Sequence, residues 1–184
     1  MADNEQTRTF YLYEQIDQSA ILELTKAIMA VIEVDNKDRE KIKDYKEQPI
    51  RLYINSYGGQ VDSMFALINV ILSSKTPIYT YCTGIAGSAA FQIFLAGHKR
   101  FAYKNTRMLY HQIQTYHDGY YPLASREDDV EEEKRLQESI EQFVISRTKC
   151  TQEYLKEVYE HKKDWWIHSD DYIKYGIVDE VLDV

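Results

Sequence analysis

The sequence predicts an α/β protein in which helices cover a mainly parallel sheet. Short runs rich in β-branched and aromatic residues, such as Ile50–Ile54 and Ile78–Thr83, alternate with stretches whose apolar residues recur at helical spacing. Strands that alternate with helices form βαβ units, and the strands of such units run parallel. The 184 residues suffice for one domain with a sizeable core, and the chain shows neither an internal repeat nor a long linker.

The first half of the chain begins with a predicted strand at residues 8–13. A helix follows, and Asp17 or Ser19 is expected to cap it, because either side chain accepts hydrogen bonds from the free N–H groups of a first turn. The polar stretch 35–48 predicts the end of that helix and a surface loop. The remaining elements of this half are a strand at 50–54, a helix at 61–72, a strand at 78–83 and a helix that ends at residue 96.

The second half contains a long charged helix, predicted at 126–148. Between Arg126 and Glu141 it carries eight acidic and three basic residues, so composition alone favours a solvated surface helix. The alternative is an arm that packs against another subunit. The other elements are strands at 100–103 and 107–111, a helix at 152–160, a last helix that Ser169 caps and Gly176 ends, and a strand at 177–182.

Composition excludes several classes of protein. The 22 basic and 30 acidic residues give a net charge of −8, which argues against a nucleic-acid partner. The two cysteines form no disulfide framework, the N-terminus has no secretory signal, and no apolar run is long enough to span a membrane. We therefore expect a cytoplasmic protein without a membrane partner. The 16 tyrosines are expected mainly in strands and interfaces, where Tyr53, Tyr79 and Tyr81 can line a docking groove.

Four of the seven glycines lie in two places, each directly after a predicted strand. Binding sites in parallel sheets form at the carboxyl ends of the strands. The pair Gly58-Gly59 leaves backbone N–H groups unshielded, so this loop can receive an anion or an oxyanion. It lacks the spacing of a phosphate-binding loop, and a plain strand–helix turn is the alternative.

The second place, Gly84 to Ser88, provides a candidate nucleophile. Ser88 opens an apolar helix, where it is either an N-cap or a nucleophile supported by the helix amides and dipole. Its surroundings differ from the Gly-x-Ser-x-Gly elbow of α/β-hydrolases.

A nucleophilic serine needs a base. Of the five histidines, His111 is the best candidate, because it ends a predicted strand and can project from the same sheet edge as Ser88. An acid between Asp164 and Asp171 can orient the base, although spacing does not choose among them. His161 and His168 have tolerable spacing for a metal, but solvated side chains are the better interpretation, so no metal is expected.

Several motifs together resemble the family of Clp protease proteolytic subunits (ClpP). The similarity runs from about Thr9 to Leu182, with the motifs in order and at fitting separations. They are Asn55-Ser56-Tyr57-Gly58-Gly59, Gly84-Ile85-Ala86-Gly87-Ser88-Ala89, Asn105-Thr106-Arg107-Met108-Leu109-Tyr110-His111-Gln112, Asp164-Trp165-Trp166-Ile167 and Tyr175-Gly176-Ile177-Val178-Asp179.

The resemblance implies a serine endopeptidase that degrades unfolded proteins or peptides without a cofactor. Ser88 then matches the nucleophile, His111 the general base and Asp164 the acid that orients the base. Gly59 and Ala89 match the residues whose N–H groups form the oxyanion hole.

The resemblance also implies a ClpP/crotonase-like spiral of ββα units in one domain, residues 1–184, with a protruding helical handle at roughly 112–148. Such subunits form heptameric rings or double-ring tetradecamers around a chamber, which favours the oligomer arm for the charged helix. An AAA+ ATPase unfoldase is the family's partner, but the N-terminus is shorter than in the family, which argues against that docking. The segment Gln112–Asp118 replaces a Gly-rich strand that pairs with peptide substrates in the family.

Two other functions stay open. A non-catalytic scaffold would keep the fold and the ring, as the altered substrate strand and short N-terminus would allow. An acyl-coenzyme A enzyme of the crotonase fold would use similar paired amides to hold an enolate, although the pair of Ser88 and His111 argues against it.

Overall fold

The computed structural model describes residues 7–115, 123–161 and 164–183, and within these ranges seven strands form one sheet. The sheet order is β1-β2-β3-β4-β7, and β5 and β6 branch from β3. All pairs are parallel except β5 with β6, so the predicted mainly parallel α/β fold is confirmed. The strands are β1 (Thr9–Leu12), β2 (Ile50–Ser56), β3 (Ile78–Gly87), β4 (Lys99–Tyr103), β5 (Arg107–His111), β6 (Asp164–Ile167) and β7 (Glu180–Leu182). The helices are α1 (Gln18–Lys41), α2 (Val61–Ser73), α3 (Ala89–Ala96), α4 (Leu123–Arg147), α5 (Gln152–His161) and α6 (Ser169–Tyr172).

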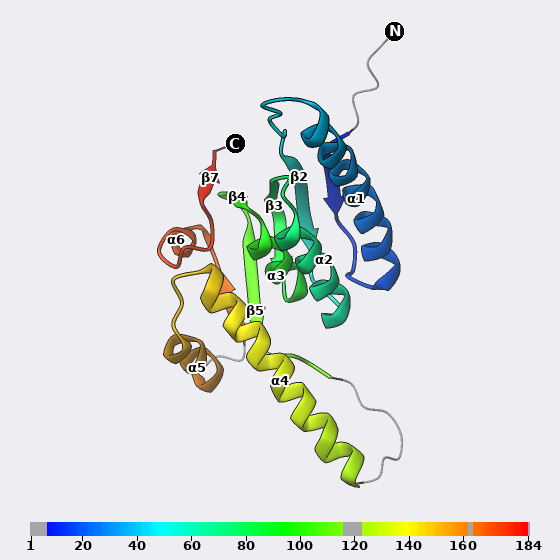
Figure 1. Cartoon of the computed structure of the whole chain (residues 1–184). Coiled ribbons are helices and arrows are strands. Elements are labelled where there is room, and N and C mark those ends of the chain that lie inside the picture. The colour runs from blue at the N-terminus through cyan, green and yellow to red at the C-terminus, as the bar shows by residue number, and fades with distance from the viewer. Residues whose placement is uncertain (1–6, 116–122, 162–163, 184) are drawn as a thin grey trace.

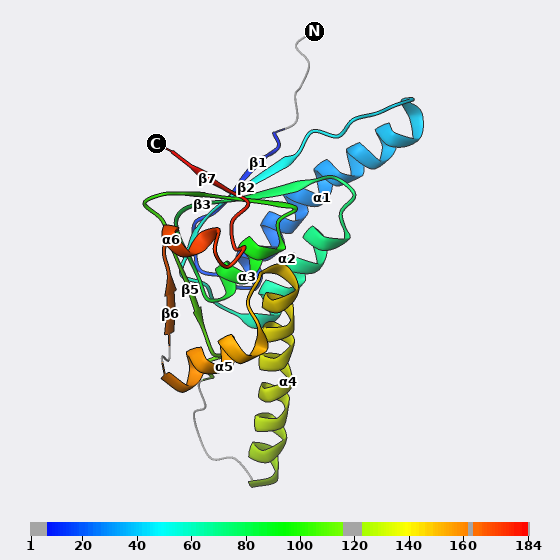
Figure 2. The same cartoon turned by 90° about the vertical axis from the view of Figure 1, so that its left-hand side faces the viewer.

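Strand β3 has different neighbours along its length. Its first half pairs with β4 over Tyr79–Cys82, and its last residues, Ile85–Gly87, pair with β5. The sheet therefore forks, and β5 and β6 extend away from the strands of the main body (Figure 2). This fork leaves the carboxyl end of β3 between the end of β2 and the start of β5, which is where the glycine-rich segments lie.

Helices α1, α2 and α3 cover one face of the sheet (Figure 1). Asp17 caps α1 by accepting a hydrogen bond from the Ala20 N–H (2.9 Å), which decides between the two expected caps. Every residue of α3 is buried. A helix that is apolar on all sides belongs in the interior, and α3 packs against the sheet next to the carboxyl end of β3.

The opposite face of the sheet carries a row of aromatic side chains. Tyr11, Tyr53, Tyr81 and Phe101 are in register on β1, β2, β3 and β4. Successive ring centroids are 5.6, 4.8 and 4.7 Å apart, and the rings are stacked. Cross-strand aromatic pairs stabilise a sheet, and three of the tyrosines in this sequence belong to this row. Tyr11 at its end is 62% exposed.

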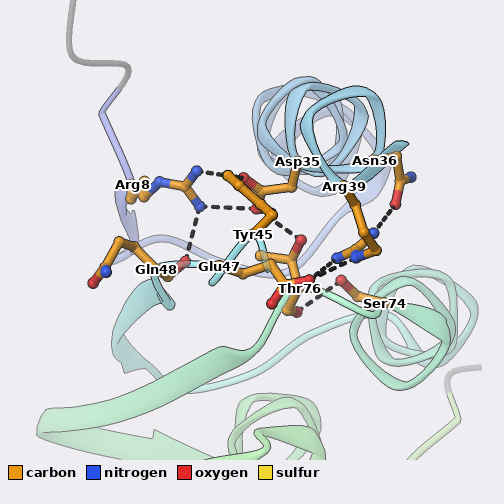
Figure 3. A network of polar contacts seen from close by, with 9 residues as sticks. All are labelled: Arg8, Asp35, Asn36, Arg39, Tyr45, Glu47, Gln48, Ser74 and Thr76. Atoms are coloured by element: carbon orange, nitrogen blue, oxygen red, sulfur yellow. Dashed lines mark hydrogen bonds and ion pairs between the residues drawn. The ribbon is translucent and has the colours of Figure 1, made fainter. Parts of the chain in front are cut away.

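The stretch 35–48, expected to be exposed and polar, contains a fully buried carboxylate. Helix α1 continues to Lys41, and the Asp35 carboxylate accepts hydrogen bonds from Arg8 (2.5 and 2.9 Å), Tyr45 (2.6 Å) and Thr76 (2.8 Å) (Figure 3). The network joins the start of β1, helix α1 and the connection before β3. The expectation of a purely solvated surface was wrong for Asp35, because three donors compensate its burial.

Helix α4 projects away from the sheet (Figures 1 and 2), and the side chains of residues 126–132 are exposed. Its last residue, Arg147, anchors the helix to the body by donating to the carbonyls of Leu95 (2.9 Å) and Gly97 (2.7 Å) at the end of α3. A cation at these carbonyls also complements the negative end of the α3 dipole.

Other boundaries differ from the sequence-based expectations. The glycine segment before Ser88 stays within β3, and the predicted last strand shortens to β7. His168 rather than Ser169 is the N-cap of α6. Strand β6 was not predicted. No helix in the described part of the chain is both long enough and apolar enough to cross a bilayer.

Candidate active site

Ser88 lies at the junction of β3 and α3 in a strained backbone conformation. Its φ of 53° and ψ of −123° lie outside the regions that L-residues ordinarily occupy. Ser88 occupies the N-cap position of α3, as one of its two interpretations expected, but its side chain makes no capping hydrogen bond. Strain of this kind costs on the order of 1–3 kcal/mol and concentrates at functional sites. The half-buried hydroxyl at the start of a buried helix is left free for chemistry.

The Gly58-Gly59 loop packs directly on Ser88. Gly58 has a φ of +109°, and a Cβ added there would lie 2.8 Å from the Ser88 Cβ and 3.0 Å from the Ala89 amide nitrogen. Only glycine permits this approach in this conformation. The two glycine-rich segments that the sequence analysis singled out therefore meet at the serine.

Two backbone N–H groups at this junction are free to donate. The Ile16 N–H donates to the Gly58 carbonyl, and the Ile16 carbonyl accepts from the Gln60 N–H. Gly59 lies between these two residues in a parallel bridge with Ile16, so its own N–H faces away from Ile16. Ala89 is the first residue of α3, where an N–H has no acceptor within its own helix. Within the described residues neither amide has a hydrogen-bond partner.

Strand β5 brings His111 to the same end of the sheet. The Ser88 N–H donates to the Leu109 carbonyl (2.8 Å), and His111 follows Leu109 by two residues at the end of β5. In the register of β5 with β6, His111 lies opposite Asp164. Side chains of directly opposite residues are neighbours in an antiparallel pair, with Cβ atoms roughly 4.5–5.5 Å apart.

The imidazole and the carboxylate are adjacent but not bonded. The His111 Nδ1 is buried without a hydrogen-bond partner among the described residues, while the Asp164 side chain is exposed. A buried ring nitrogen without a partner is costly and marks the position where an acceptor or donor is missing.

The other histidines lie elsewhere. The His98 Nδ1 accepts a hydrogen bond from the Ile78 N–H (3.1 Å), and His168 is exposed at the start of α6. His117 lies outside the described residues, and the side chain of His161 is likewise not described. The described side chains contain no group of three or more His, Cys, Asp or Glu residues placed to hold a metal.

Asn55 and Ser56, to which the sequence analysis gave no role of their own, shape the site. The Asn55 Oδ1 accepts from the Ile85 N–H (3.1 Å), and the Ser56 Oγ accepts from the Gly58 N–H (3.2 Å) and donates to the Glu14 carbonyl (2.6 Å). The first bond joins the end of β2 to β3, and the other two join the glycine loop to Ser56 and Ser56 to the segment that follows β1. A cleft of about 540 Å³ opens beside the loop. It is lined by Tyr13, Glu14, Gln15, Asn55, Ser56, Tyr57, Gly58 and Gly59.

The model of the Clp protease family matches residues 4–184. This chain belongs to the Clp protease family. The ATP-dependent Clp protease proteolytic subunit 1 of Tropheryma whipplei (strain Twist) is 28% identical over 186 residues, which cover 95% of this chain and 88% of the relative. The ATP-dependent Clp protease proteolytic subunit of Deinococcus radiodurans is 30% identical over 139 residues, which cover 74% of this chain and 66% of the relative.

The fold agrees with the family. The solved structure of a point mutant of ClpP1 from Listeria monocytogenes superposes with a TM-score of 0.76 at 26% sequence identity, over 96% of this chain and 92% of that one. The resemblance to Clp proteases and the ClpP/crotonase-like α/β fold expected from the sequence are therefore confirmed. Membership of this family supports a serine protease.

The Gly58 contact yields a prediction for the reactivity of Ser88. Gly58→Ala is expected to slow phosphonylation of Ser88 by a fluorophosphonate by roughly 100-fold, because the new methyl group displaces Ser88 and the Ala89 amide. Gly97→Ala, whose methyl group would meet the Thr80 side chain away from Ser88, is the control. The rate is measured per folded protein, and equal rates in both variants would contradict the prediction.

Proposed function

We propose that this Clp protease family member is a serine endopeptidase that cleaves unfolded polypeptides by acyl-enzyme chemistry. The observation that carries the proposal is the hydroxyl of Ser88, which makes no capping hydrogen bond and belongs to a residue with a strained backbone. The N–H groups of Gly59 and Ala89 lie at the same junction, and the strand that ends at His111 is adjacent. Such an arrangement suits a nucleophile whose attack creates a negative charge that needs donors.

In the proposed reaction the Ser88 Oγ attacks the scissile carbonyl carbon while His111 accepts the hydroxyl proton. The N–H groups of Gly59 and Ala89 hold the oxyanion of the tetrahedral intermediate. When the C–N bond breaks, His111 gives the proton to the leaving amine and the acyl group stays on Ser88 as an ester. Water activated by His111 then hydrolyses this ester and restores the serine.

Asp164 has the role of orienting the His111 imidazole. The opposed positions on β5 and β6 support this role, since rotation of two side chains is enough to bring the carboxylate to the buried Nδ1. We propose that this bond forms in the assembled, substrate-bound enzyme. It would fix the imidazole tautomer and stabilise the imidazolium that forms during the reaction.

The proposed assembly is a heptameric ring or a double-ring tetradecamer of one-domain subunits in the cytoplasm. The projecting α4, within a handle at roughly 112–148, supports an oligomer arm, because the side chains of its residues 126–132 are exposed and available to another subunit. The relatives are named as subunits of ATP-dependent proteases, which supports an AAA+ ATPase partner. The aromatic row, which is half-buried at Tyr53, Tyr81 and Phe101 and exposed at Tyr11, offers that partner an apolar surface.

Incubation of the assembled protein with an unstructured polypeptide tests this function. Wild type is expected to produce internal fragments, whereas Ser88→Ala produces none. Ser73→Ala, which alters an exposed serine at the end of α2, is the matched control and keeps wild-type activity. An intact oligomer that makes no fragments would establish the scaffold alternative, and saturable binding of an acyl-coenzyme A would revive the crotonase-type alternative.

A further inference from the structure

A separate cavity of about 270 Å³ lies between β6 and the helices α5 and α6. Its walls combine aromatic rings with acidic side chains. They include Tyr154, Trp165, Trp166, Tyr175, Glu157 and Asp171. Pockets for drug-sized ligands hold roughly 300–1,000 Å³, so this cavity has room for a single side chain or for a molecule of that size.

The aromatic wall of the cavity is already in place without a ligand. Tyr154 and Tyr175 are stacked with ring centroids 4.9 Å apart, and Trp165 meets both rings edge-on at 5.1 Å. Trp165 is buried, and its ring also meets the ring of Tyr110 edge-on at 6.5 Å. Because these rings hold one another, a ligand does not have to order them when it binds.

Two rings of this wall hold cations of the chain itself. The Lys174 Nζ lies 4.6 Å from the centroid of the Tyr175 ring, and the Arg107 guanidinium lies 5.1 Å from that of the Trp166 ring. Neither cation is among the described residues that line the cavity. The face of an aromatic ring attracts a cation, so the wall suits a positively charged ligand.

The acidic side chains of the cavity favour the same kind of ligand. Glu157 is exposed, and the neighbouring Lys156 forms its ion pair with Glu160 instead (3.9 Å). Within the described part of the chain, neither Glu157 nor Asp171 has an ion pair or a side-chain hydrogen bond. The described lining residues therefore contribute two negative charges and no positive charge.

Strand β6 places this cavity close to the proposed catalytic residues. Alternate side chains of a strand share a face, so Trp166 lies on the same face of β6 as Asp164. Trp166 is opposite Leu109, whose carbonyl accepts from the Ser88 N–H. Trp166 is therefore two strand spacings from Ser88, roughly 10 Å, which an extended peptide spans with about three residues.

We propose that this cavity binds the side chain of an arginine in the polypeptide substrate, about three residues from the bond that Ser88 cleaves. The planar guanidinium stacks on aromatic faces and donates paired hydrogen bonds to a carboxylate, and its alkyl stem packs on apolar surface. That the arginine belongs to a substrate rests on the proposed function. Binding in the cavity needs no catalysis.

Titration of the assembled Ser88→Ala protein with Nα-acetyl-arginine amide tests the cavity alone. The sequence has two tryptophans and both line the cavity, so tryptophan fluorescence reports a ligand at this place. We expect a Kd of about 0.1–1 mM for this small ligand. The citrulline analogue has the same shape without the charge and is expected to bind at least about tenfold more weakly.

A matched pair of variants locates the binding. Glu157→Gln is expected to weaken binding of the arginine amide about threefold to fivefold, as the loss of an exposed ion pair predicts. Glu153→Gln, at an exposed position of the same helix outside the described lining of the cavity, is the control and leaves the Kd unchanged. Equal affinity for the arginine and citrulline amides, or equal effects of the two variants, would overturn the site.

Cleavage of matched peptides tests whether the arginine belongs to a substrate. The peptides carry either arginine or citrulline about three positions before or after the cleaved bond. In wild type one arginine peptide is expected to have a KM about threefold to tenfold lower than its citrulline partner, and Trp166→Leu removes this difference. Equal KM values for every pair in wild type would overturn the substrate role. Failure to cleave any peptide, with normal binding of the arginine amide, would instead refute the proposed function.

Discussion

Ser88→Ala is expected to lower kcat/KM for peptide hydrolysis by at least about 10³-fold, because the acyl-enzyme cannot form without the hydroxyl. The change removes one oxygen atom that makes no capping bond, so it costs α3 no hydrogen bond. We therefore expect the same unfolding transition and the same oligomer as in the wild type. Hydrolysis of a fluorogenic peptide, measured together with denaturant unfolding, checks both parts of the prediction.

A second variant shows whether Ser88 and His111 act as one unit. Residues that share a single reaction step are strongly non-additive, so Ser88→Ala with His111→Ala is expected to lose no more activity than Ser88→Ala alone. Losses that multiply in the double variant would show that the two side chains work independently, which is incompatible with a nucleophile and its base.

Asp35→Asn is expected to have the largest effect on stability. Burial opposes ionisation of Asp35, but hydrogen bonds from Arg8, Tyr45 and Thr76, with the charge of Arg8, outweigh it and lower the pKa of the carboxyl to about 2. With a pKa of about 3.9 in the unfolded chain, the shift corresponds to about 2–3 kcal/mol of stabilisation at neutral pH. Denaturant unfolding at pH 7 is expected to show a loss of this size.

The pH dependence follows from the direction of that shift. Because the folded-state pKa is depressed, the stabilisation is complete above about pH 4 and is lost as the pH falls towards 2. The difference in unfolding free energy between wild type and Asp35→Asn should therefore shrink over this range. Glu33→Gln, an exposed change on the same helix, is the control with no such pH-dependent difference. A difference that is constant from about pH 7 to about pH 2.5 would contradict this account.

The position of the candidate site was predictable because it depends on the order of strands and glycine-rich segments along the chain. Glycine-rich segments after two parallel strands must meet at one edge of the sheet, and a histidine that ends a third strand reaches the same edge. The positive φ of Ser88 and the close approach of Gly58 were not predictable, because they follow from how α3 and the loop pack on each other. Sequence alone therefore left the N-cap interpretation open.

Asp35 and strand β6 show where local sequence carries too little information. The partners of Asp35 include Arg8 and Thr76, which are 27 and 41 positions away, so a polar stretch gives no sign of a buried carboxylate. Strand β6 has only four residues and begins with Asp164, and it forms because β5 supplies an antiparallel partner. That pairing places Asp164 opposite His111, which spacing within the chain could not have selected.

The most direct test of the central claim is to react the assembled protein with a fluorophosphonate and to locate the adduct by peptide mass spectrometry. Ser88 as the nucleophile predicts a single phosphonylated residue, Ser88, with a rate that falls strongly in His111→Ala. An adduct on another residue, or no adduct on a well-folded oligomer, would contradict the claim that Ser88 is the nucleophile of this protease.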